Sequence, residues 1–310
     1  STLPLSSTVG GMHPNLALNR SLRHLAEALG YNESYFYSFE SKKVYEKLLL
    51  PENAPEWQQI MISNPLGEDF SVMRTSSVPG MLQALSLNNR HKNKDVKLFE
   101  MAKLYIPKSL PLTELPDERM TLTLGFIGEG DFFSLKGEIE ELFMHCGLNG
   151  RFHYDGNCEK PYYHPGRKAN ILYEGKLLGT MGEIHPDVLK NFDLKERAYV
   201  AVLDLEEVYP LAGDHKKYTP VAKFPAVSHD FSLLVPLSVT AIREAASPLL
   251  EKVELFDIYE GAQVLAGFKS LSYNVSLRAK DHTLSEEEIN KVRGDLLAAL
   301  EKIGVKLRDM

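Results

Sequence analysis

Five side chains between residues 145 and 164 have the chemistry of metal ligands. They are His145, Cys146, His153, Cys158 and His164. Structural zinc sites usually take paired ligands two to four residues apart, whereas this series is irregular. The two cysteines form neither a CxxC pair nor a disulfide framework, which is typical of a reducing compartment. We therefore expect no metal site, and a cytoplasmic location.

Arg74 follows two carboxylates, Glu68 and Asp69, and this combination allows two interpretations. An arginine beside acidic residues could take part in acid–base catalysis, but such groups are more often structural ion pairs at a turn. Gly128 and Gly130 form a Gly-x-Gly without the lysine and hydroxyl residue of a P-loop. We expect an ion pair at Arg74 and no phosphate-binding loop.

Residues 270–278 alternate between apolar and polar types, as a strand with one open face does. The residues expected to face the helices are Leu271, Tyr273, Val275 and Leu277. An open polar face can hydrogen-bond unpaired bases, and nearby aromatics can stack on them. The residues expected to bind RNA on this face or its rim are Lys223, His229, Asp230, Ser232, Asn274, Ser276, Arg278 and Lys280. The alternative is that the face is only solvated.

The composition is that of a globular protein with room for two domains. The chain has 310 residues, of which 44% are hydrophobic and 25% are charged. It has no apolar run near the ~20 residues of a membrane span, so we expect no membrane contact. The net charge of −7 argues against RNA binding by the whole surface. Residues 216–310 carry 13 basic and 13 acidic residues, so any RNA contact there must be local.

A helix is expected at residues 14–30, after a polar linker at residues 1–13 that begins without methionine. Its leucines recur at spacings of four, three and four: Leu18, Leu22, Leu25 and Leu29. Gly30 is a natural stop. This stripe could face the domain's own core or a partner subunit.

The remaining elements predict two α+β domains. The first contains a strand–helix–strand at residues 64–105 and a hairpin that turns at residues 174–176. Its helices and antiparallel strands fit an α+β sheet better than a parallel one. After a boundary near residues 209–214, the order becomes βαββαβ, which is the ferredoxin-like order. A helix is expected at residues 240–249, and another begins with a capping box at Ser285 and Glu288.

Two parts of the chain carry a resemblance to one family. The pattern of residues 64–105 is NPL..D.SVMRTS..PG.L.AL........K..KLFE.AKLY, and the second domain contains KFPAVSHDFSLLV, VELFDIYEG and RAKDHTLSEEEI. They resemble the synthetase-like core and the ferredoxin-fold anticodon-binding domain of the bacterial phenylalanyl-tRNA synthetase beta subunit. The resemblance implies a class II synthetase-like core at residues 14–212 and an anticodon-binding domain at residues 217–310. It also implies the C-terminal portion of a longer subunit, in which the Leu18–Leu29 stripe meets the partner.

The resemblance also implies that the core lacks a working catalytic site. Class II synthetases bind the phosphates of ATP with an arginine in an FRxE-type strand and another in a GLGLERL-type strand and helix. This chain reads Lys97-Leu98-Phe99-Glu100 at the first position. It reads Leu203-Asp204-Leu205-Glu206-Glu207-Val208 at the second, where Asp204 and Glu207 would repel a triphosphate. We therefore expect no catalytic residues and no cofactor in this chain.

The interpretation that follows is a noncatalytic beta-subunit portion of phenylalanine–tRNA ligase. It would support the catalytic alpha subunit in an alpha2-beta2 heterotetramer and bind phenylalanine tRNA. ATP and magnesium would belong to the assembled enzyme. Two alternatives remain: an interaction module without an RNA role, and a free-standing class II-like enzyme, which would need the missing arginines.

Overall fold

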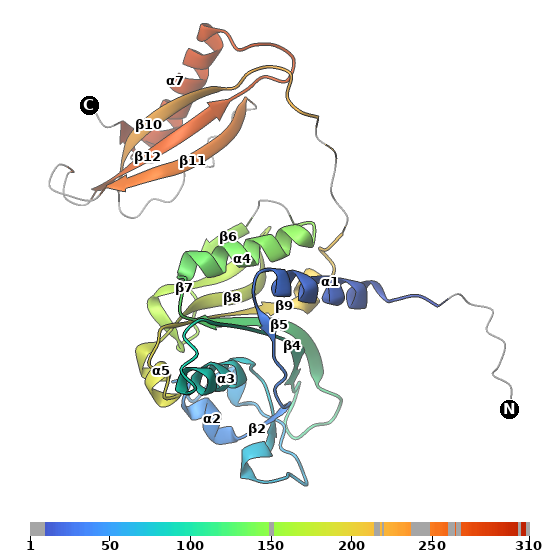
Figure 1. The fold of residues 1–310 in the computed structure, drawn as a ribbon. Coiled ribbons are helices and arrows are strands. Elements are labelled where there is room, and N and C mark those ends of the chain that lie inside the picture. The colour runs from blue at the N-terminus through green and yellow to red at the C-terminus, as the bar shows by residue number, and fades with distance from the viewer. Residues whose placement is uncertain are drawn as a thin grey trace. The chain divides into compact units, whose positions relative to one another are not determined.

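The structure, a computed structural model, describes residues 10–148, 152–213, 218, 220–236, 249–259, 264, 268–302 and 305–307. The chain forms two compact units, at residues 1–216 and 217–310. Both are α+β structures (Figure 1). None of the helices in the described ranges is long and apolar enough to cross a membrane.

The first unit is built on a seven-stranded sheet with the order β1-β4-β5-β9-β8-β7-β6. Its strands are β1 (Asn32–Glu33), β4 (Val96–Ile106), β5 (Asp117–Ile127), β6 (Phe152–Asp155), β7 (Tyr163–Tyr173), β8 (Lys176–Ile184) and β9 (Ala198–Asp204). All neighbours are antiparallel except β1 and β4. A separate pair joins β2 (Phe39–Glu40) to β3 (Val72–Met73). The predicted hairpin is confirmed, since Glu174 and Gly175 both have the positive φ that a two-residue hairpin turn requires.

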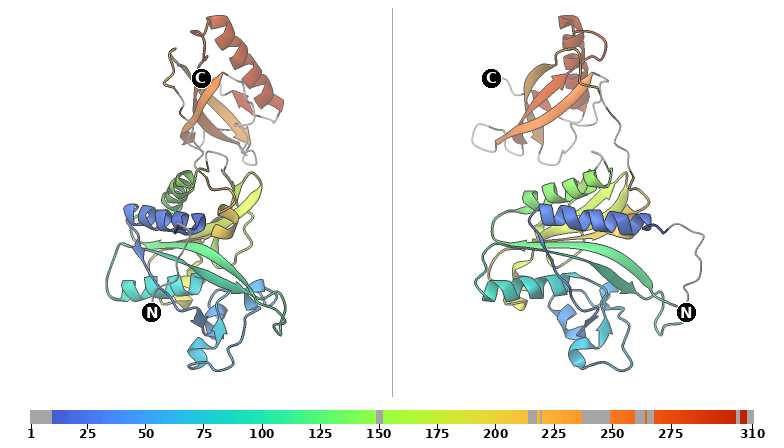
Figure 2. Two further views of the ribbon diagram at one scale, coloured as in Figure 1. Left: turned by 90° about the vertical axis from the view of Figure 1, so that its right-hand side faces the viewer. Right: turned by 45° about the vertical axis from the view of Figure 1, so that its right-hand side comes forward.

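Helices cover both faces of this sheet (Figure 2). On one face lie α1 (Pro14–Ala28) and α4 (Phe132–His145), and on the other lie α2 (Lys42–Glu46), α3 (Val78–Arg90) and α5 (Pro186–Asn191). The short elements are the 3-10 turns η1 (Pro55–Trp57) and η2 (Glu68–Phe70), and α6 (Leu205–Val208), which follows β9. Each face has its own buried hydrophobic cluster.

The residues of β5 show why α3 can lie directly on the sheet. Leu122, Leu124 and Phe126 point to the α1–α4 face and are fully buried. Gly125 points to the opposite face, where a Cβ atom would lie 2.5 Å from the Met81 side chain of α3. The missing side chain therefore lets α3 approach the centre of the sheet closely. The helices α2, α3 and α5 all pack on this face.

The second unit is a four-stranded sheet with the order β11-β12-β10-β13. Its elements are β10 (Val227–Pro236), β11 (Leu250–Tyr259), β12 (Phe268–Leu277), α7 (Glu286–Lys302) and β13 (Lys306–Leu307). This strand order is that of a ferredoxin-like fold. The helix expected at residues 240–249 lies, except for Leu249, outside the described residues. The core joins the strands to α7 and includes Phe231, Leu233, Val275, Leu296 and Leu300.

Candidate functional site

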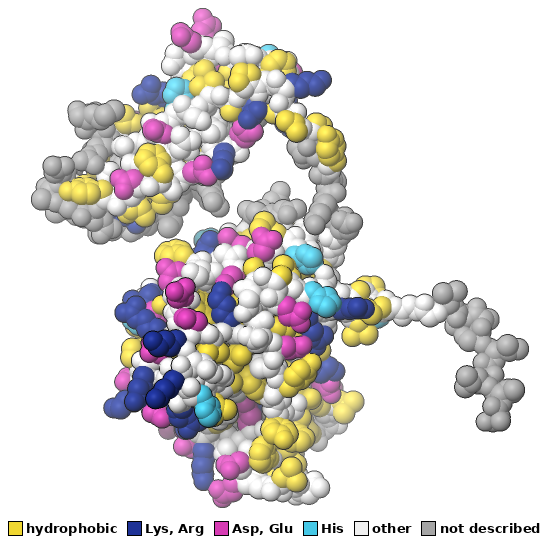
Figure 3. Space-filling view, viewed as in Figure 1, with side chains coloured by type: hydrophobic (Ala, Val, Ile, Leu, Met, Phe, Trp, Pro, Cys, Tyr) yellow, Lys and Arg dark blue, Asp and Glu magenta, His cyan; other side chains and the backbone are white. Residues whose placement is uncertain are grey.

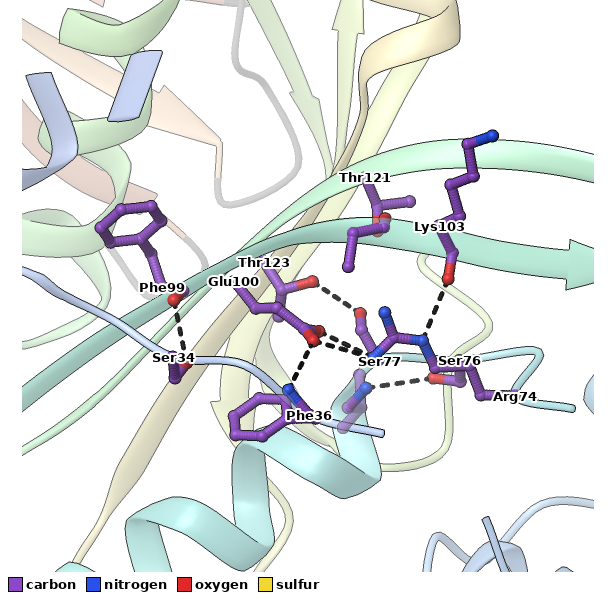
Figure 4. Close-up of polar contacts among 12 residues, drawn as sticks. Ser34, Phe36, Arg74, Ser76, Ser77, Phe99, Glu100, Lys103, Thr121 and Thr123 are labelled. Carbon is purple, nitrogen blue, oxygen red and sulfur yellow. Dashed lines mark hydrogen bonds and ion pairs between the residues drawn. The ribbon is translucent and has the colours of Figure 1, made fainter. Parts of the chain in front are cut away.

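Arg74 is the only arginine among the fully buried side chains of the described residues, and it is held by Glu100. Its Nη1 atom lies 2.9 Å from both carboxylate oxygens, and its Nε donates to the Lys103 carbonyl at 3.0 Å (Figure 4). The Phe36 amide also donates to Glu100. Burial raises the pKa of Glu100, and the Arg74 guanidinium opposes that rise. The ion pair predicted at Arg74 exists, but its partner comes from β4.

Glu68 and Asp69 do not form that pair. Glu68 bonds Lys43 at 2.9 Å on the surface, where both side chains are exposed. Glu68 and Asp69 lie on the exposed turn η2. Arg74 directly follows β3, and its side chain is buried. The expected constellation of one arginine with two nearby carboxylates is therefore corrected to a buried Arg74–Glu100 pair.

Asp204 and Glu207, at the end of β9 and in α6, bind a cation of the chain itself. Arg119 Nη2 lies 2.6 Å from Asp204 and 2.8 Å from Glu207, and Lys176 Nζ lies 2.8 Å from Glu207. Hydrogen bonds from Lys176 and Arg119 lower the pKa of Glu207. These carboxylates are therefore neutralised by the protein, and Arg119 is not presented to a ligand. A triphosphate with its magnesium does not fit this arrangement, since the cations are already bonded to acids.

The fold does not gather the five potential metal ligands between residues 145 and 164 into one site. Cys146 belongs to the cluster under α1 and α4, whereas Cys158 belongs to the cluster on the other face of the sheet. Burial raises the pKa of Cys146 to about 12, so its thiol stays protonated. His145 bonds the Ser21 hydroxyl, and His164 accepts the Gly166 amide. The described residues contain no group of three or more His, Cys, Asp or Glu side chains that could hold a metal ion.

The leucine stripe of α1 faces the chain's own core. Leu22 is 2% exposed, and Leu18, Leu25 and Leu29 pack on the same cluster as α4. The expectation that this stripe meets a partner subunit is therefore wrong for Leu22, because no surface of it remains to be buried. The face of α1 that solvent reaches instead carries Leu16, which is 58% exposed.

The open face of the second sheet is a ladder of polar pairs. The Asn274 amide donates to Asp230 at 2.7 Å, and hydroxyl pairs join Ser228 to Ser276 and Ser232 to Ser272. The apolar neighbours on β12 point into the core, as the alternation predicts. Lys223 and Lys280 are exposed.

Two residues predicted for this face lie elsewhere or are already engaged. His229 is opposite Val275 in the register, and Val275 is a core residue, so the imidazole belongs to the helix-covered side. Arg278 is bonded through Nε to Glu251 at 2.9 Å and through Nη1 to the Phe224 carbonyl at 2.8 Å. Adjacent strand residues point to opposite faces, so His229 and Asp230 could not share one.

Phe256 is a candidate that the sequence pattern did not reveal. It lines a hollow of about 430 Å³ together with Asp230, Glu254, Leu255 and Asn274, and it is 59% exposed. The register of β11 shifts between Leu255 and Asp257, so simple alternation assigns Phe256 no reliable face. The only signal was the adjacent apolar pair Leu255-Phe256, which interrupts the alternation of the strand LEKVELFDIY.

Two family models match the chain. One is described as "Phenylalanyl tRNA synthetase beta chain CLM domain" and matches residues 1–205. The other is described as "Ferredoxin-fold anticodon binding domain" and matches residues 222–308. The chain belongs to the phenylalanyl-tRNA synthetase beta chain family.

Curated members of this beta chain family are similar along nearly the whole chain. The "Phenylalanine--tRNA ligase beta subunit" of Clostridium tetani is 41% identical over 286 residues, which is 90% of this chain and 36% of the relative. That of Clostridium acetobutylicum is 40% identical over the same share of each, and that of Symbiobacterium thermophilum is 35% identical over 98% of this chain and 36% of the relative. The chain thus spans about a third of the length of these relatives.

The first unit of this beta chain family member has the fold of a class II synthetase core. The crystal structure of pyrrolysyl-tRNA synthetase from Desulfitobacterium hafniense matches with a TM-score of 0.53 and 15% identity, over 64% of this chain and 69% of that chain. This likeness concerns the fold alone. The predicted combination of a synthetase-like core and a ferredoxin-fold domain is confirmed.

Proposed function

We propose that this chain is the noncatalytic part of a phenylalanine–tRNA ligase beta subunit, which supports a catalytic alpha subunit and binds the anticodon region of phenylalanine tRNA. The assembled ligase, an alpha2-beta2 heterotetramer in the cytoplasm, uses ATP and magnesium on the alpha subunit. The internal bonding of Arg119 supports the absence of a phosphate site in this chain. The proposed domain boundaries are a linker at residues 1–13, a synthetase-like core at residues 14–212 and an RNA-binding domain at residues 217–310.

The observation that carries the RNA-binding role is the hollow on the open sheet face. Phe256 offers an exposed ring on which a base can stack, and Asn274 and Asp230 offer amide and carboxylate groups to a base edge. The carboxylates of Asp230 and Glu254 favour base donors over phosphates. Backbone phosphates would then be held by basic side chains at the rim, such as Lys223, Lys280 and Arg278.

Substitution of Phe256 tests the stacking role. Stacking of one base on an aromatic ring contributes about 1–3 kcal/mol, so Phe256→Ala should weaken binding of phenylalanine tRNA about 5- to 150-fold in a filter-binding assay. Phe133→Ala is a matched control, because Phe133 is 72% exposed on α4 of the other unit. Equal affinity of both variants and the wild type would move the RNA site to another surface. A wild type that binds no tRNA would favour the interaction module without an RNA role.

Arg278 needs a second control because it also has structural partners. If it contacts a phosphate, Arg278→Ala should reduce the log–log salt dependence of tRNA binding by roughly 0.7. Glu251→Gln removes the carboxylate partner and leaves the guanidinium, so it should not reduce that slope. An unchanged slope in Arg278→Ala would show that this arginine only joins β12 to β11 and the segment before β10.

A further inference from the structure

Three aromatic side chains before α2 point away from the protein. Exposure alternates along residues 35–40, and the outward side chains are Tyr35 at 79%, Tyr37 at 71% and Phe39 at 38%. The intervening Phe36 and Glu40 point inward. Large exposed aromatics in one cluster are unusual on a surface that stays in water.

The backbone of this segment is fixed, so the aromatics cannot turn into the core. The Phe36 amide donates to the buried Glu100 at 3.0 Å (Figure 4), and the Phe36 ring lies where a Cβ atom of Gly80 would be only 2.9 Å away. The Ser34 amide and hydroxyl both donate to the Phe99 carbonyl. Since Phe36 is anchored on α3 and β4, period-two alternation holds Tyr35 and Tyr37 outward.

These aromatics line a groove of about 620 Å³. Its other walls come from Phe70 at the end of η2 and from Gln83, Leu87 and Arg90 of α3. Leu87 is 49% exposed, and hydrophobic side chains gather around β2 at the lower edge of the first unit (Figure 3). Protein–protein interfaces are enriched in tyrosine, phenylalanine and arginine, which are the side chains that line this groove.

Glu40 gives the groove a second, independent feature. It lines the groove, is only 9% exposed, and its Oε2 atom has no hydrogen-bond partner among the described residues. The nearby Arg74 is already committed to Glu100. A buried carboxyl oxygen without a donor is costly unless something supplies one.

We propose that this aromatic groove docks the catalytic alpha subunit, through a segment that places an arginine or lysine beside Glu40 and apolar side chains on Tyr35 and Tyr37. The inference rests on the proposed function. Glu40 and Asp69 face a single groove cation, Arg90, so the charge suits a basic polypeptide better than the phosphates of RNA. The aromatic groove thereby replaces the Leu18–Leu29 stripe as the expected subunit contact.

Docking of a cation beside Glu40 also links association to pH. The pKa of Glu40 is raised to about 7, mainly by burial. The hydrogen bond of Tyr45 and the charge of Arg74 oppose this rise, and the charge of Glu100 contributes to it. Burial raises the pKa of Tyr45 far above neutrality, and Asp69 and Arg90 are the other charged groups of the groove. A basic partner favours the ionised carboxylate, so docking releases a proton, and the affinity should rise as pH increases through 7.

The first test measures association with the cognate alpha subunit by calorimetry or sedimentation. The double variant Tyr35→Ser/Tyr37→Ser should bind at least about tenfold more weakly than the wild type, with unchanged circular dichroism and tRNA affinity. The control Tyr218→Ser removes a tyrosine that is 86% exposed near the start of the second unit, and should bind normally.

Unchanged binding of the double variant would overturn the inference and leave the proposed function standing. A wild type that does not bind the alpha subunit at all would instead contradict the proposed function. Loss of tRNA affinity without loss of subunit binding would make the groove an RNA site.

The second test uses the pH dependence. Wild-type affinity for the alpha subunit should increase severalfold from pH 6 to pH 8, and proton release should appear as a buffer-dependent binding enthalpy. Glu40→Gln keeps the shape and removes the titration, so its affinity should change less over the same range. Identical pH profiles for the wild type and Glu40→Gln would exclude a cation beside Glu40.

Discussion

Arg74 and Glu100 form a buried ion pair that joins the segment after β3 to the middle of β4, with Nη1 2.9 Å from both carboxylate oxygens. The pair lies on the sheet face that α3 covers, beside the hydroxyl pair of Ser77 and Thr123. Each group compensates the charge of the other, and both side chains are almost completely buried. The pair thus gives the centre of this face a structural ion pair.

Removal of one partner of this pair should destabilise the first unit strongly. Arg74→Met leaves Glu100 buried without its cation, and we expect a loss of about 3–5 kcal/mol in the free energy of unfolding. The double variant Arg74→Met/Glu100→Leu removes both charges and should recover most of that loss. Urea unfolding followed by circular dichroism measures both values. A double variant as unstable as the single one would show that packing, not the unpaired charge, sets the cost.

Substitutions on the buried and the exposed face of α1 should have different effects on stability. Leu22→Ala opens a cavity under a side chain that is 2% exposed, and should cost about 2–5 kcal/mol of unfolding free energy. Leu16→Ala changes a leucine that is 58% exposed, and should leave stability nearly unchanged. Thermal unfolding of the two variants beside the wild type is sufficient. Similar losses at both positions would mean that α1 is oriented differently.

The isolated chain should not catalyse phenylalanine-dependent exchange between ATP and pyrophosphate. Arg119 is held by Asp204 and Glu207, so its guanidinium is not free to bind a triphosphate. Pure protein in a radiolabelled exchange assay should give the background rate, with the reconstituted ligase as positive control. Exchange by the pure chain that disappears in Arg119→Ala would favour the free-standing enzyme.

The second unit should lose stability as the pH rises above 6.5, because His282, just before α7, then loses its charge. His282 bonds Asp281 at 2.8 Å and Glu288 at 2.9 Å, and these bonds raise its pKa above 6.5. A raised pKa means that the contribution is complete below pH 6.5 and is lost as the pH rises through the folded value. Unfolding temperatures of the wild type should therefore fall across this range more steeply than those of His282→Gln. An NMR titration of the imidazole that gives a pKa at or below 6.5 would refute this.

The hydrogen bonds of Glu288 should affect the stability of the second unit at acidic pH. The Ser285 amide, with smaller contributions from His282 and the Ser285 hydroxyl, lowers the pKa of Glu288 to about 2. The stability that this carboxylate contributes is present above 4.5 and is lost as the pH falls toward 2. Glu288→Gln should flatten this acid limb of the unfolding temperature against pH. It should also weaken the limb above pH 6.5, because His282 then keeps only its bond to Asp281.

Local patterns were sufficient to predict most elements of the fold. The capping box at Ser285 and Glu288 placed the start of α7, and Pro79 in its first turn marked α3. The alternation of β12 assigned its two faces correctly, because Val275 and Leu277 are buried. These features depend on residues within one helical turn or one strand.

The features that the sequence did not predict depend on distant pairing. Glu100 is 26 positions from Arg74, and Glu207 is 88 from Arg119, so spacing alone could not join them. The bulge in β11 hid the orientation of Phe256. A leucine stripe looks the same whether its own sheet or another subunit covers it, so only the buried state of Leu22 decided between the two.

The separate cores of the two units have a consequence for how such a chain can change. Phe231, Leu271 and Leu300 belong to the second unit's own cluster, and the two clusters around the first sheet contain residues of the first unit alone. Recombination at the junction near residue 217 would therefore divide none of these three clusters of described residues. A gene fusion could therefore exchange the ferredoxin-like unit for another domain while the clusters around the first sheet stay intact, which makes this junction suitable for domain exchange and engineering.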